Sequence, residues 1–304
     1  MYEMNVVPER VIKFSGIGCS SKSPTYFLNR SFGFNSLHGR MPSIATGALF
    51  GDHTLKGLGV SGDGDTASIG MGQFKHITRR NVNMVYIVEN NGVYGLTKGQ
   101  FSATAEKGLS LKHQGSNQYM PVDICMEALA SNATFIARSF AGNPKQVKEL
   151  LKAAMAHKGI AVLDIISPCV TFNNQDTAYH SYSWGKDHEA PLHDISYIAP
   201  RNEIILEEEM KEGEIREVNL HDGSIIILKN LERDYDPTNR FEAIHILAEA
   251  QANNWLATGL IYIETDKPSL TEIYNLVDTP LNRLAESDLR PAPAMIDKVN
   301  ALMF

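Results

Sequence analysis

The feature that most constrains the fold is an alternation of short apolar runs with helical patterns over roughly the first 170 residues. Strands are expected at residues 10–15, 56–61, 84–89, 135–139 and 161–167, and helices at 41–50, 68–80, 122–130 and 143–157. This alternation is typical of βαβ units, in which helices connect parallel strands. The run at 161–167 is almost continuously apolar, as a strand buried on both faces requires. We therefore expect an α/β fold with a parallel sheet and helices on both faces.

The character of the chain changes after Pro168. Residues 170–200 are rich in Asn, His, Tyr, Trp and Ser without periodicity, which indicates a loop. Residues 214–229 predict a hairpin that turns at 221–224. A last helix from Asp236-Pro237 and a final strand at 260–265 complete the chain. We expect a ligand-binding domain over residues 1–200 and a C-terminal extension over 201–304 that packs on this domain or on a partner subunit.

The motif that carries the most chemistry is Gly62-Asp63-Gly64-Asp65 after one predicted strand, with Asn90-Asn91 ending the next. Glycines let a ligand approach the backbone closely, and the helix expected near Ser68 directs free N–H groups at the same place, which favours phosphate. A carboxylate there would repel phosphate unless a cation lay between them. Asp63 and the side-chain oxygen of Asn91 suit Mg²⁺, and the carbonyl of Val93 completes the set. The alternative is a tight turn and a strand end without a ligand.

The spacing of these two fragments resembles the thiamine diphosphate enzymes, in which GDG precedes a double Asn by some two dozen residues. Here residues 65–89 separate Gly64 from Asn90. The resemblance implies that residues 1–200 form the domain that binds the diphosphate half of thiamine diphosphate. It also implies Mg²⁺ held by Asp63, Asn91 and Val93.

Further segments resemble the β subunits of 2-oxoacid:ferredoxin oxidoreductases, in the same order along the chain. These are Gly16-Ile17-Gly18-Cys19-Ser20-Ser21, His38-Gly39-Arg40, Tyr94-Gly95-Leu96-Thr97-Lys98-Gly99-Gln100, Ser167-Pro168-Cys169, and, as in the 2-oxoglutarate type, 234–238 and 276–282. The resemblance implies oxidative decarboxylation of a 2-oxo acid to an acyl-coenzyme A, with electrons passed to ferredoxin. It further implies an α subunit, which supplies the glutamate that activates the cofactor, so that this chain is inactive alone.

The same resemblance assigns roles to individual residues. The cofactor pocket is expected to include Gly16, Ile17, Gly18, Cys19, His38, Gly39, Arg40, Gly62, Asp63, Gly64, Asp65, Asn91, Val93, Tyr94, Gly95, Leu96 and Thr97. Lys98 and Lys22 are candidates for contact with a substrate carboxylate or with coenzyme A. For both lysines a solvated surface charge is the alternative, and His38 is equally well explained as a hydrogen-bonded loop residue.

The cysteines depart from the family pattern. The family's β subunit carries a Cys-x-x-Cys near its N-terminus, and four cysteines hold one [4Fe–4S] cluster. Cys19 and Cys169 match two of these ligands, Cys125 falls in a predicted helix, and the chain has no Cys-x-x-Cys. Two thiolates cannot close a four-thiolate site. Either the native protein begins upstream, which we favour, or the cluster is absent or otherwise ligated, or these cysteines are relics.

Composition excludes several other classes of protein. A net charge of −7 and the lack of a dense Lys/Arg run argue against a nucleic-acid partner. No apolar stretch approaches the roughly 20 residues that cross a bilayer, and residues 1–10 lack a signal-peptide core, so we expect a cytoplasmic protein. Two functions remain as alternatives: a non-oxidative thiamine-dependent 2-oxoacid decarboxylase or ligase, and a non-catalytic partner-binding subunit.

Overall fold

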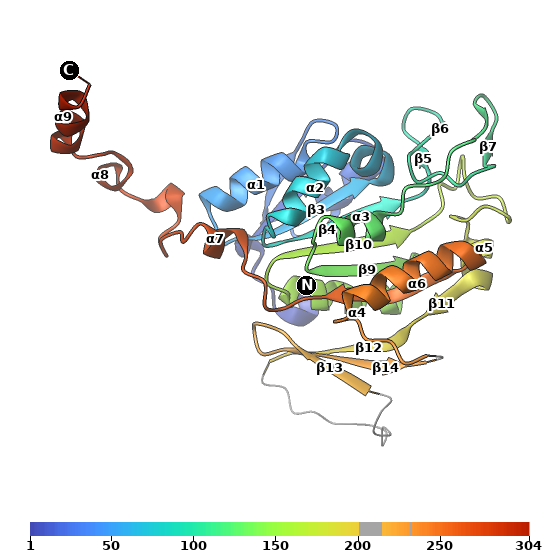
Figure 1. Ribbon diagram of the computed structural model, residues 1–304. Coiled ribbons are helices and arrows are strands. Elements are labelled where there is room, and N and C mark those ends of the chain that lie inside the picture. The colour runs from blue at the N-terminus through green and yellow to red at the C-terminus, as the bar shows by residue number, and fades with distance from the viewer. Residues whose placement is uncertain (201–214, 232, 304) are drawn as a thin grey trace.

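The computed structural model describes residues 1–200, 215–231 and 233–303. Its centre is an eight-stranded sheet (Figure 1). In spatial order the strands are β11 (Glu189–Pro191), β15 (Leu256–Ile263), β9 (Phe135–Phe140), β10 (Ile160–Ile166), β4 (Met84–Asn90), β3 (Lys56–Gly62), β1 (Val11–Ser15) and β2 (Phe32–Asn35). The expected parallel sheet is confirmed except at one place: β15 runs antiparallel to β9. The sequence of β2 gave no strand signal, because all four of its residues are exposed at the sheet edge.

Helices cover one face of the sheet, as expected. They are α1 (Met41–Gly51), α2 (Met71–Arg79), α3 (Ile124–Ala130) and α6 (Arg240–Asn253). Their apolar side chains form a core with the sheet that includes Met41, Phe74, Ile124 and Leu247. Burial of these side chains stabilises the layer by roughly 1.5–3 kcal/mol each.

The other face is covered by one long helix and a second sheet instead of helices alone. Helix α4 (Pro144–Ala156) begins at an Asn143 side chain that caps it, as the Asn-Pro signal predicts. Beside it lies an antiparallel sheet of β12 (His193–Ile198), β14 (Ile225–Asn230) and β13 (Ile215–Asn219). The hairpin β13–β14 confirms the predicted turn, although Glu214, where we began it, lies outside the described residues.

Two polar segments of the chain contain regular structure. Residues 170–200 include α5 (Tyr182–His188), β11 and β12, so the expectation of an unbroken loop there is wrong. These elements are short, and the pattern of a short element is easily hidden by polar residues. The polar segment after β4 holds two small hairpins, β5 (Val93–Tyr94) with β6 (Gln100–Phe101) and β7 (Ser110–Leu111) with β8 (Gly115–Ser116).

The chain ends in an arm that leads away from the sheet (Figure 1). It carries α7 (Leu270–Ile273), α8 (Glu286–Leu289) and α9 (Pro293–Ala301). Asn282 and Arg283 tie its first part to Asp52 at the end of α1, at 3.0 and 3.4 Å. In the part of the chain that is described, no helix is both long and apolar enough to cross a membrane.

Five short helical turns occur among the described residues. Three are 3₁₀ helices in the N-terminal region, at Tyr2–Met4, Pro8–Arg10 and Cys19–Tyr26, and a fourth lies at Leu281–Arg283. A π-helical turn, Gly64–Ile69, directly follows β3 and leads into α2. The helix that we expected from Ser68 therefore begins earlier, next to Asp63.

Candidate functional site

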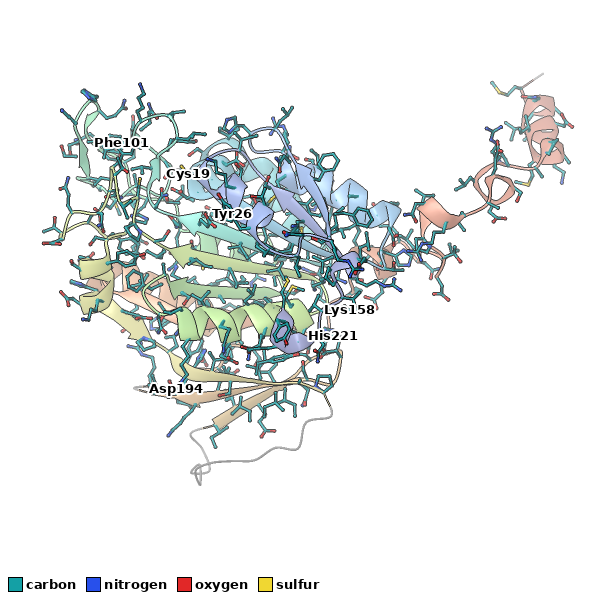
Figure 2. All side chains as sticks on the ribbon, turned by 180° about the vertical axis from the view of Figure 1, so that it is seen from behind. Cys19, Tyr26, Phe101, Lys158, Asp194 and His221 are labelled. Atoms are coloured by element: carbon teal, nitrogen blue, oxygen red, sulfur yellow. The ribbon has the colours of Figure 1, made fainter. Side chains whose placement is uncertain are left out.

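The site lies at the C-terminal ends of β1, β3 and β4, which are neighbours in the sheet. Figure 2 shows Cys19, after β1, and Phe101, in the segment after β4, at this end of the molecule, away from Lys158 and His221. Ligands of open α/β sheets bind at this edge, because the loops that leave successive strands meet there.

Asp63 is the most deeply placed charged residue of the predicted set. It directly follows β3, and only 1% of the residue is exposed. Its Oδ2 accepts hydrogen bonds from the hydroxyls of Ser102 and Thr104, and among the described residues its Oδ1 accepts a 3.4 Å contact from the Asn91 N–H alone. No ion pair to this carboxylate occurs among the described residues. Burial raises the pKa of Asp63, and the two hydroxyls offset this in part.

The second half of the motif forms a tight turn beside Asp63. Asn91 follows β4, and its Oδ1 accepts the N–H of Val93 at 3.1 Å, with Gly92 between them at φ +74°. The side chain of Asn173 stabilises this turn by donating a hydrogen bond to the Asn91 carbonyl oxygen at 2.9 Å. The structure thus brings Asp63 and Asn91 together, as the strand order predicts.

The side chain of Asn90 hydrogen-bonds to three other side chains. Its Nδ2 donates to Asp164 at 3.0 Å, and its Oδ1 lies 2.9 Å from the Thr104 hydroxyl and 3.2 Å from Nε2 of His180. Burial, with help from the charge of Arg138, lowers the pKa of His180 to about 3, so its ring is neutral. The two asparagines therefore have different roles: Asn90 is structural, and Asn91 lies at the site.

Two of the predicted glycines are required by close approach. A Cβ on Gly16 would lie 2.0 Å from Oδ2 of Asp65. A Cβ on Gly64 would lie 2.5 Å from the ring of Tyr94, whose hydroxyl donates to the Gly64 carbonyl at 2.8 Å. These contacts pack the loops after β1, β3 and β4 against one another.

Asp65 connects two of the predicted segments. Its Oδ1 accepts from the Gly39 N–H at 2.8 Å and lies 3.0 Å from Nδ1 of His38, and its Oδ2 accepts from Ser61 at 2.9 Å. Protein donors therefore occupy this carboxylate, and its part in the site is to hold residues 38–40 in place. His38 keeps 52% of its side chain exposed, and Arg40 is exposed next to it.

One polar atom at this edge was missed by the sequence reasoning. The hydroxyl of Ser20 is buried and has no hydrogen-bond partner in the described structure. It lies 3.4 Å from the place that a Cβ of Gly62 would occupy. Burial of a hydroxyl without a hydrogen-bond partner costs folding free energy unless a ligand or a water molecule supplies the partner. The sequence feature from which Ser20 could have been predicted is its position in the Gly18-Cys19-Ser20-Ser21 segment.

The two family-matched cysteines converge over one glycine. The Sγ atoms of Cys169 and Cys19 lie 3.3 and 3.7 Å from the position of a Cβ on Gly95. Both are free thiols, Cys19 exposed and Cys169 half-buried, whereas Cys125 is buried in the core as expected. Cys19 follows β1 and Cys169 follows β10, so the C-terminal ends of two strands of the sheet bring these thiols to one place. No group of three or more His, Cys, Asp or Glu side chains arranged for a metal occurs in the described ranges.

The remaining predicted residues lie on exposed loops. Lys22 is exposed on the 3₁₀ helix after Cys19, and Lys98 is exposed in the tip between β5 and β6 with Leu96 and Thr97. Lys98 has φ +77°, the left-handed region that side chains other than glycine rarely adopt. Neither of these two lysines contacts Asp63 in the isolated chain.

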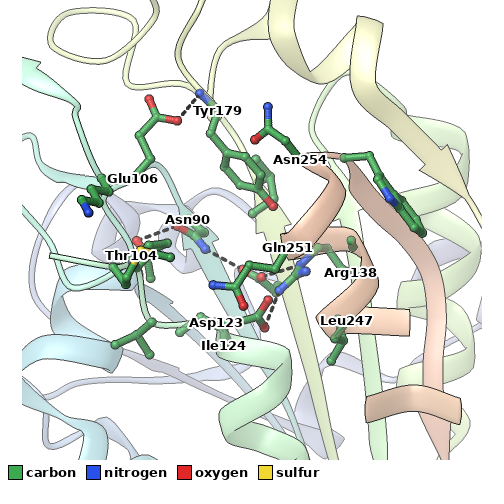
Figure 3. Close-up of a pocket in the computed structure, with 18 residues that line it drawn as sticks. Asn90, Thr104, Glu106, Asp123, Ile124, Arg138, Tyr179, Leu247, Gln251 and Asn254 are labelled. Atoms are coloured by element: carbon green, nitrogen blue, oxygen red, sulfur yellow. Dashed lines mark hydrogen bonds and ion pairs between the residues drawn. The ribbon is translucent and has the colours of Figure 1, made fainter. Parts of the chain in front are cut away.

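A cavity of about 240 Å³ lies behind the site, and sequence reasoning missed it (Figure 3). Arg138, which is 4% exposed, lines the cavity and donates hydrogen bonds to Asp164 at 2.9 Å and to Asp123 at 2.7 Å. Asn90 and Thr104 also line the cavity. Hydrogen bonds lead from this buried ion cluster to Asn90, whose side-chain oxygen lies 2.9 Å from the Thr104 hydroxyl beside Asp63.

Comparison with known proteins agrees with this geometry. Residues 16–165 match the family model of the thiamine pyrophosphate enzyme C-terminal TPP-binding domain. The 2-oxoacid:ferredoxin oxidoreductase β subunit of Saccharolobus solfataricus is 40% identical over 176 residues, 58% of each chain. The 2-oxoglutarate oxidoreductase subunit KorB of Mycobacterium tuberculosis is 40% identical over 176 residues, 57% of this chain and 46% of that protein. The matched regions span less than two thirds of these relatives.

One solved structure is similar over nearly all of the chain. It is the 2-oxoglutarate:ferredoxin oxidoreductase from Magnetococcus marinus with 2-oxoglutarate, coenzyme A and succinyl-CoA bound. The TM-score is 0.73 at 28% identity, and the alignment covers 99% of this chain and 84% of the other. The chain therefore belongs to the family of thiamine pyrophosphate-binding β subunits of 2-oxoacid:ferredoxin oxidoreductases.

Proposed function

We propose that this chain is the β subunit of a 2-oxoglutarate:ferredoxin oxidoreductase and holds thiamine diphosphate through Mg²⁺ at the ends of β3 and β4. The observation that carries the proposal is the Asp63 carboxylate. It is buried beside Asn91 with no cationic partner among the described residues, inside a domain of the thiamine pyrophosphate-binding family.

The residues at this edge fit a hard divalent cation. Oδ1 of Asp63, the side-chain oxygen of Asn91 and the carbonyl of Val93 are oxygen ligands of the kind that Mg²⁺ prefers. A cation here would also compensate the buried charge of Asp63, whose pKa burial raises.

The surroundings also fit a diphosphate. Gly62 presents no side chain toward the edge, and the hydroxyl of Ser20, which has no partner among the described residues, lies next to it. This hydroxyl is a donor without an acceptor, and phosphate oxygens are acceptors. When bound, the cofactor supplies the carbanion chemistry by which a 2-oxo acid loses carbon dioxide.

The proposed reaction converts 2-oxoglutarate and coenzyme A to succinyl-CoA and carbon dioxide, and two electrons pass to ferredoxin. The ligands named for the M. marinus enzyme support this choice of substrate. We assign Lys98 and Lys22 to the recognition of substrate or coenzyme A anions, because both are exposed cations on loops at the cofactor edge. The lysines would bind and orient these anions by charge-assisted hydrogen bonds.

We further propose that the chain works with an α subunit and contributes two thiolates to a [4Fe–4S] cluster. The convergence of Cys19 and Cys169 at Gly95 supports the second part. A four-thiolate cluster needs two thiolates in addition to these. Cys125 cannot contribute, because it is buried between α3 and the sheet.

The test compares Asp63→Ala with Asp187→Ala, a control at an exposed position on α5. Asp63→Ala should abolish Mg²⁺-dependent binding of thiamine diphosphate by the complex with the α subunit, measured by calorimetry, and with it coenzyme A-dependent ferredoxin reduction. Retention of cofactor near the wild-type level would refute the assignment of Asp63. Decarboxylation by the wild type without ferredoxin or coenzyme A would instead indicate a non-oxidative enzyme.

A further inference from the structure

The two oxygens of the Asp63 carboxylate have different surroundings. Oδ2 accepts two hydroxyl hydrogen bonds, from Thr104 at 2.6 Å and from Ser102 at a shorter distance. In the part of the chain that the structure describes, the only donor near Oδ1 is the Asn91 N–H at 3.4 Å, which is longer than a good hydrogen bond. Oδ2 is therefore occupied by hydrogen bonds from the protein. Oδ1 remains available on the side of Asn91 and the ligand edge.

The segment that supplies these hydroxyls is fixed on both sides. The N–H of Ser102 donates to the Gly92 carbonyl at 3.0 Å, in the turn that carries Asn91. The N–H of Ala103 donates to the hydroxyl of Ser68 at 3.0 Å, in the π-helical turn after Asp63. Ser102 and Thr104 are both buried. Backbone contacts thus hold the two hydroxyls in register with both halves of the GDG and Asn-Asn motif.

Both hydroxyls can donate a hydrogen bond to Asp63 at the same time. The single proton of Thr104 has three candidate acceptors: Asp63 at 2.6 Å, the Asn90 side-chain oxygen at 2.9 Å and the Ser102 hydroxyl oxygen at 2.9 Å. His180 Nε2 lies 3.2 Å from the same oxygen of Asn90 and can donate to it. With that donor in place, the Thr104 proton is free for the shorter contact to Asp63. Ser102 donates its own proton and accepts the Thr104 N–H at 3.3 Å.

We infer that Ser102 and Thr104 are positioning residues of the metal site: they bind Oδ2 of Asp63, so that the carboxylate meets the cation through Oδ1 alone. This inference rests on the proposed function. Mg²⁺ requires near-octahedral geometry with short bonds, which a carboxylate bound through one oxygen satisfies, whereas Ca²⁺ accepts a carboxylate through both oxygens. The two hydroxyls therefore favour Mg²⁺ over Ca²⁺ as well as strengthening its binding.

The experiment uses Ser102→Ala and Thr104→Val, which remove each hydroxyl with little change of shape, and Thr104→Ser, which restores it. Ser116→Ala is the control, since this hydroxyl is exposed in the same segment. Calorimetry on the complex with the α subunit measures thiamine diphosphate binding against Mg²⁺ and against Ca²⁺. Loss of a hydrogen bond to a ligating group typically weakens metal affinity by about 10- to 100-fold.

Ser102→Ala and Thr104→Val should each weaken Mg²⁺ by about this factor and lower the preference for Mg²⁺ over Ca²⁺. Thr104→Ser and Ser116→Ala should match the wild type. A purely structural role would weaken both cations equally, and that result would overturn the inference, as would unchanged binding in both variants. Thermal unfolding identifies any variant that fails to fold, in which case the remaining single variant and Thr104→Ser decide. Absence of Mg²⁺-dependent binding in the wild type would contradict the proposed function instead.

Discussion

Lys98 combines an exposed side chain with a backbone conformation that disfavours it. At φ +77° a residue with a Cβ costs of the order of 1–2 kcal/mol relative to glycine. The next residue, Gly99, also has positive φ and packs against Phe172, so the tip between β5 and β6 is tightly constrained. A lysine at such a position, at the cofactor edge, supports a role for its charge.

At the residue scale we therefore predict that Lys98→Ala lowers kcat/KM for the 2-oxo acid by about tenfold to a hundredfold, the loss of one charge-assisted contact. Lys98→Gly should lose as much activity but unfold with a free energy higher than Lys98→Ala by about 1 kcal/mol, because glycine relieves the backbone. Steady-state kinetics and urea unfolding measure the two effects. Lys112→Ala, on an exposed loop, is the control. Wild-type kinetics in both Lys98 variants would show that this side chain is only a solvated surface charge.

At the scale of elements, His193 joins the second sheet to the central one. Its Nε2 accepts the Leu260 N–H at 2.9 Å, where the pairing of β15 with β9 shifts register. A Cβ on Gly259, at φ +120°, would lie 2.8 Å from the ring, so the histidine fills the space that this glycine leaves. Burial lowers the pKa of His193 to about 4.

This depressed pKa predicts an acid-sensitive contact between the two sheets. Its stabilisation is present above the unfolded-state pKa of about 6.5 and is lost as pH falls toward 4, because the unfolded chain takes up the proton first. The 2.5-unit difference between these pKa values corresponds to about 3 kcal/mol of unfolding free energy. In His193→Gln, urea unfolding should show a smaller loss between pH 6.5 and 4 than in the wild type or in the exposed control His245→Gln. An identical pH dependence in all three proteins would show that His193 does not titrate in this way.

At the scale of the whole molecule, the C-terminal arm has apolar side chains and no core of its own. Neither α8 nor α9 buries a residue. Exposed apolar side chains of the arm include Leu289, Met295, Ile296, Val299 and Leu302. A contiguous apolar surface of this kind marks a contact with another protein. Because we propose an α subunit as partner, the arm is our candidate for part of that contact.

Removal of residues 286–304 should accordingly weaken association with the α subunit while leaving the unfolding free energy of the β chain within about 0.5 kcal/mol. Analytical ultracentrifugation of the mixed subunits measures the first effect, and urea unfolding of the isolated chain the second. Ile296→Asp combined with Val299→Asp should reproduce the loss of association, and Asp297→Asn on the same helix is the matched control. Full association of the shortened chain would place the contact elsewhere.

The sequence determined the parts of this protein that depend on local pattern. Apolar runs and helix caps located most strands and helices of the central sheet, because periodicity and capping are short-range properties. The GDG and Asn-Asn motif predicted the meeting of Asp63 and Asn91, since parallel strands bring their C-terminal ends to one edge. Cys19 and Cys169 meet for the same reason, since they follow β1 and β10 of one sheet.

Only the tertiary structure decided which side chains complete that edge. Ser102 and Thr104 reach Asp63 from about 40 residues away through an irregular segment, and no periodicity encodes such a contact. Asp65, which we assigned to the cofactor pocket, has its carboxylate occupied by protein donors. The antiparallel direction of β15 depends likewise on how the chain returns after α6. Strand ends can be located from local pattern, but side-chain partners are selected by the packing of loops, which the sequence specifies only through the whole fold.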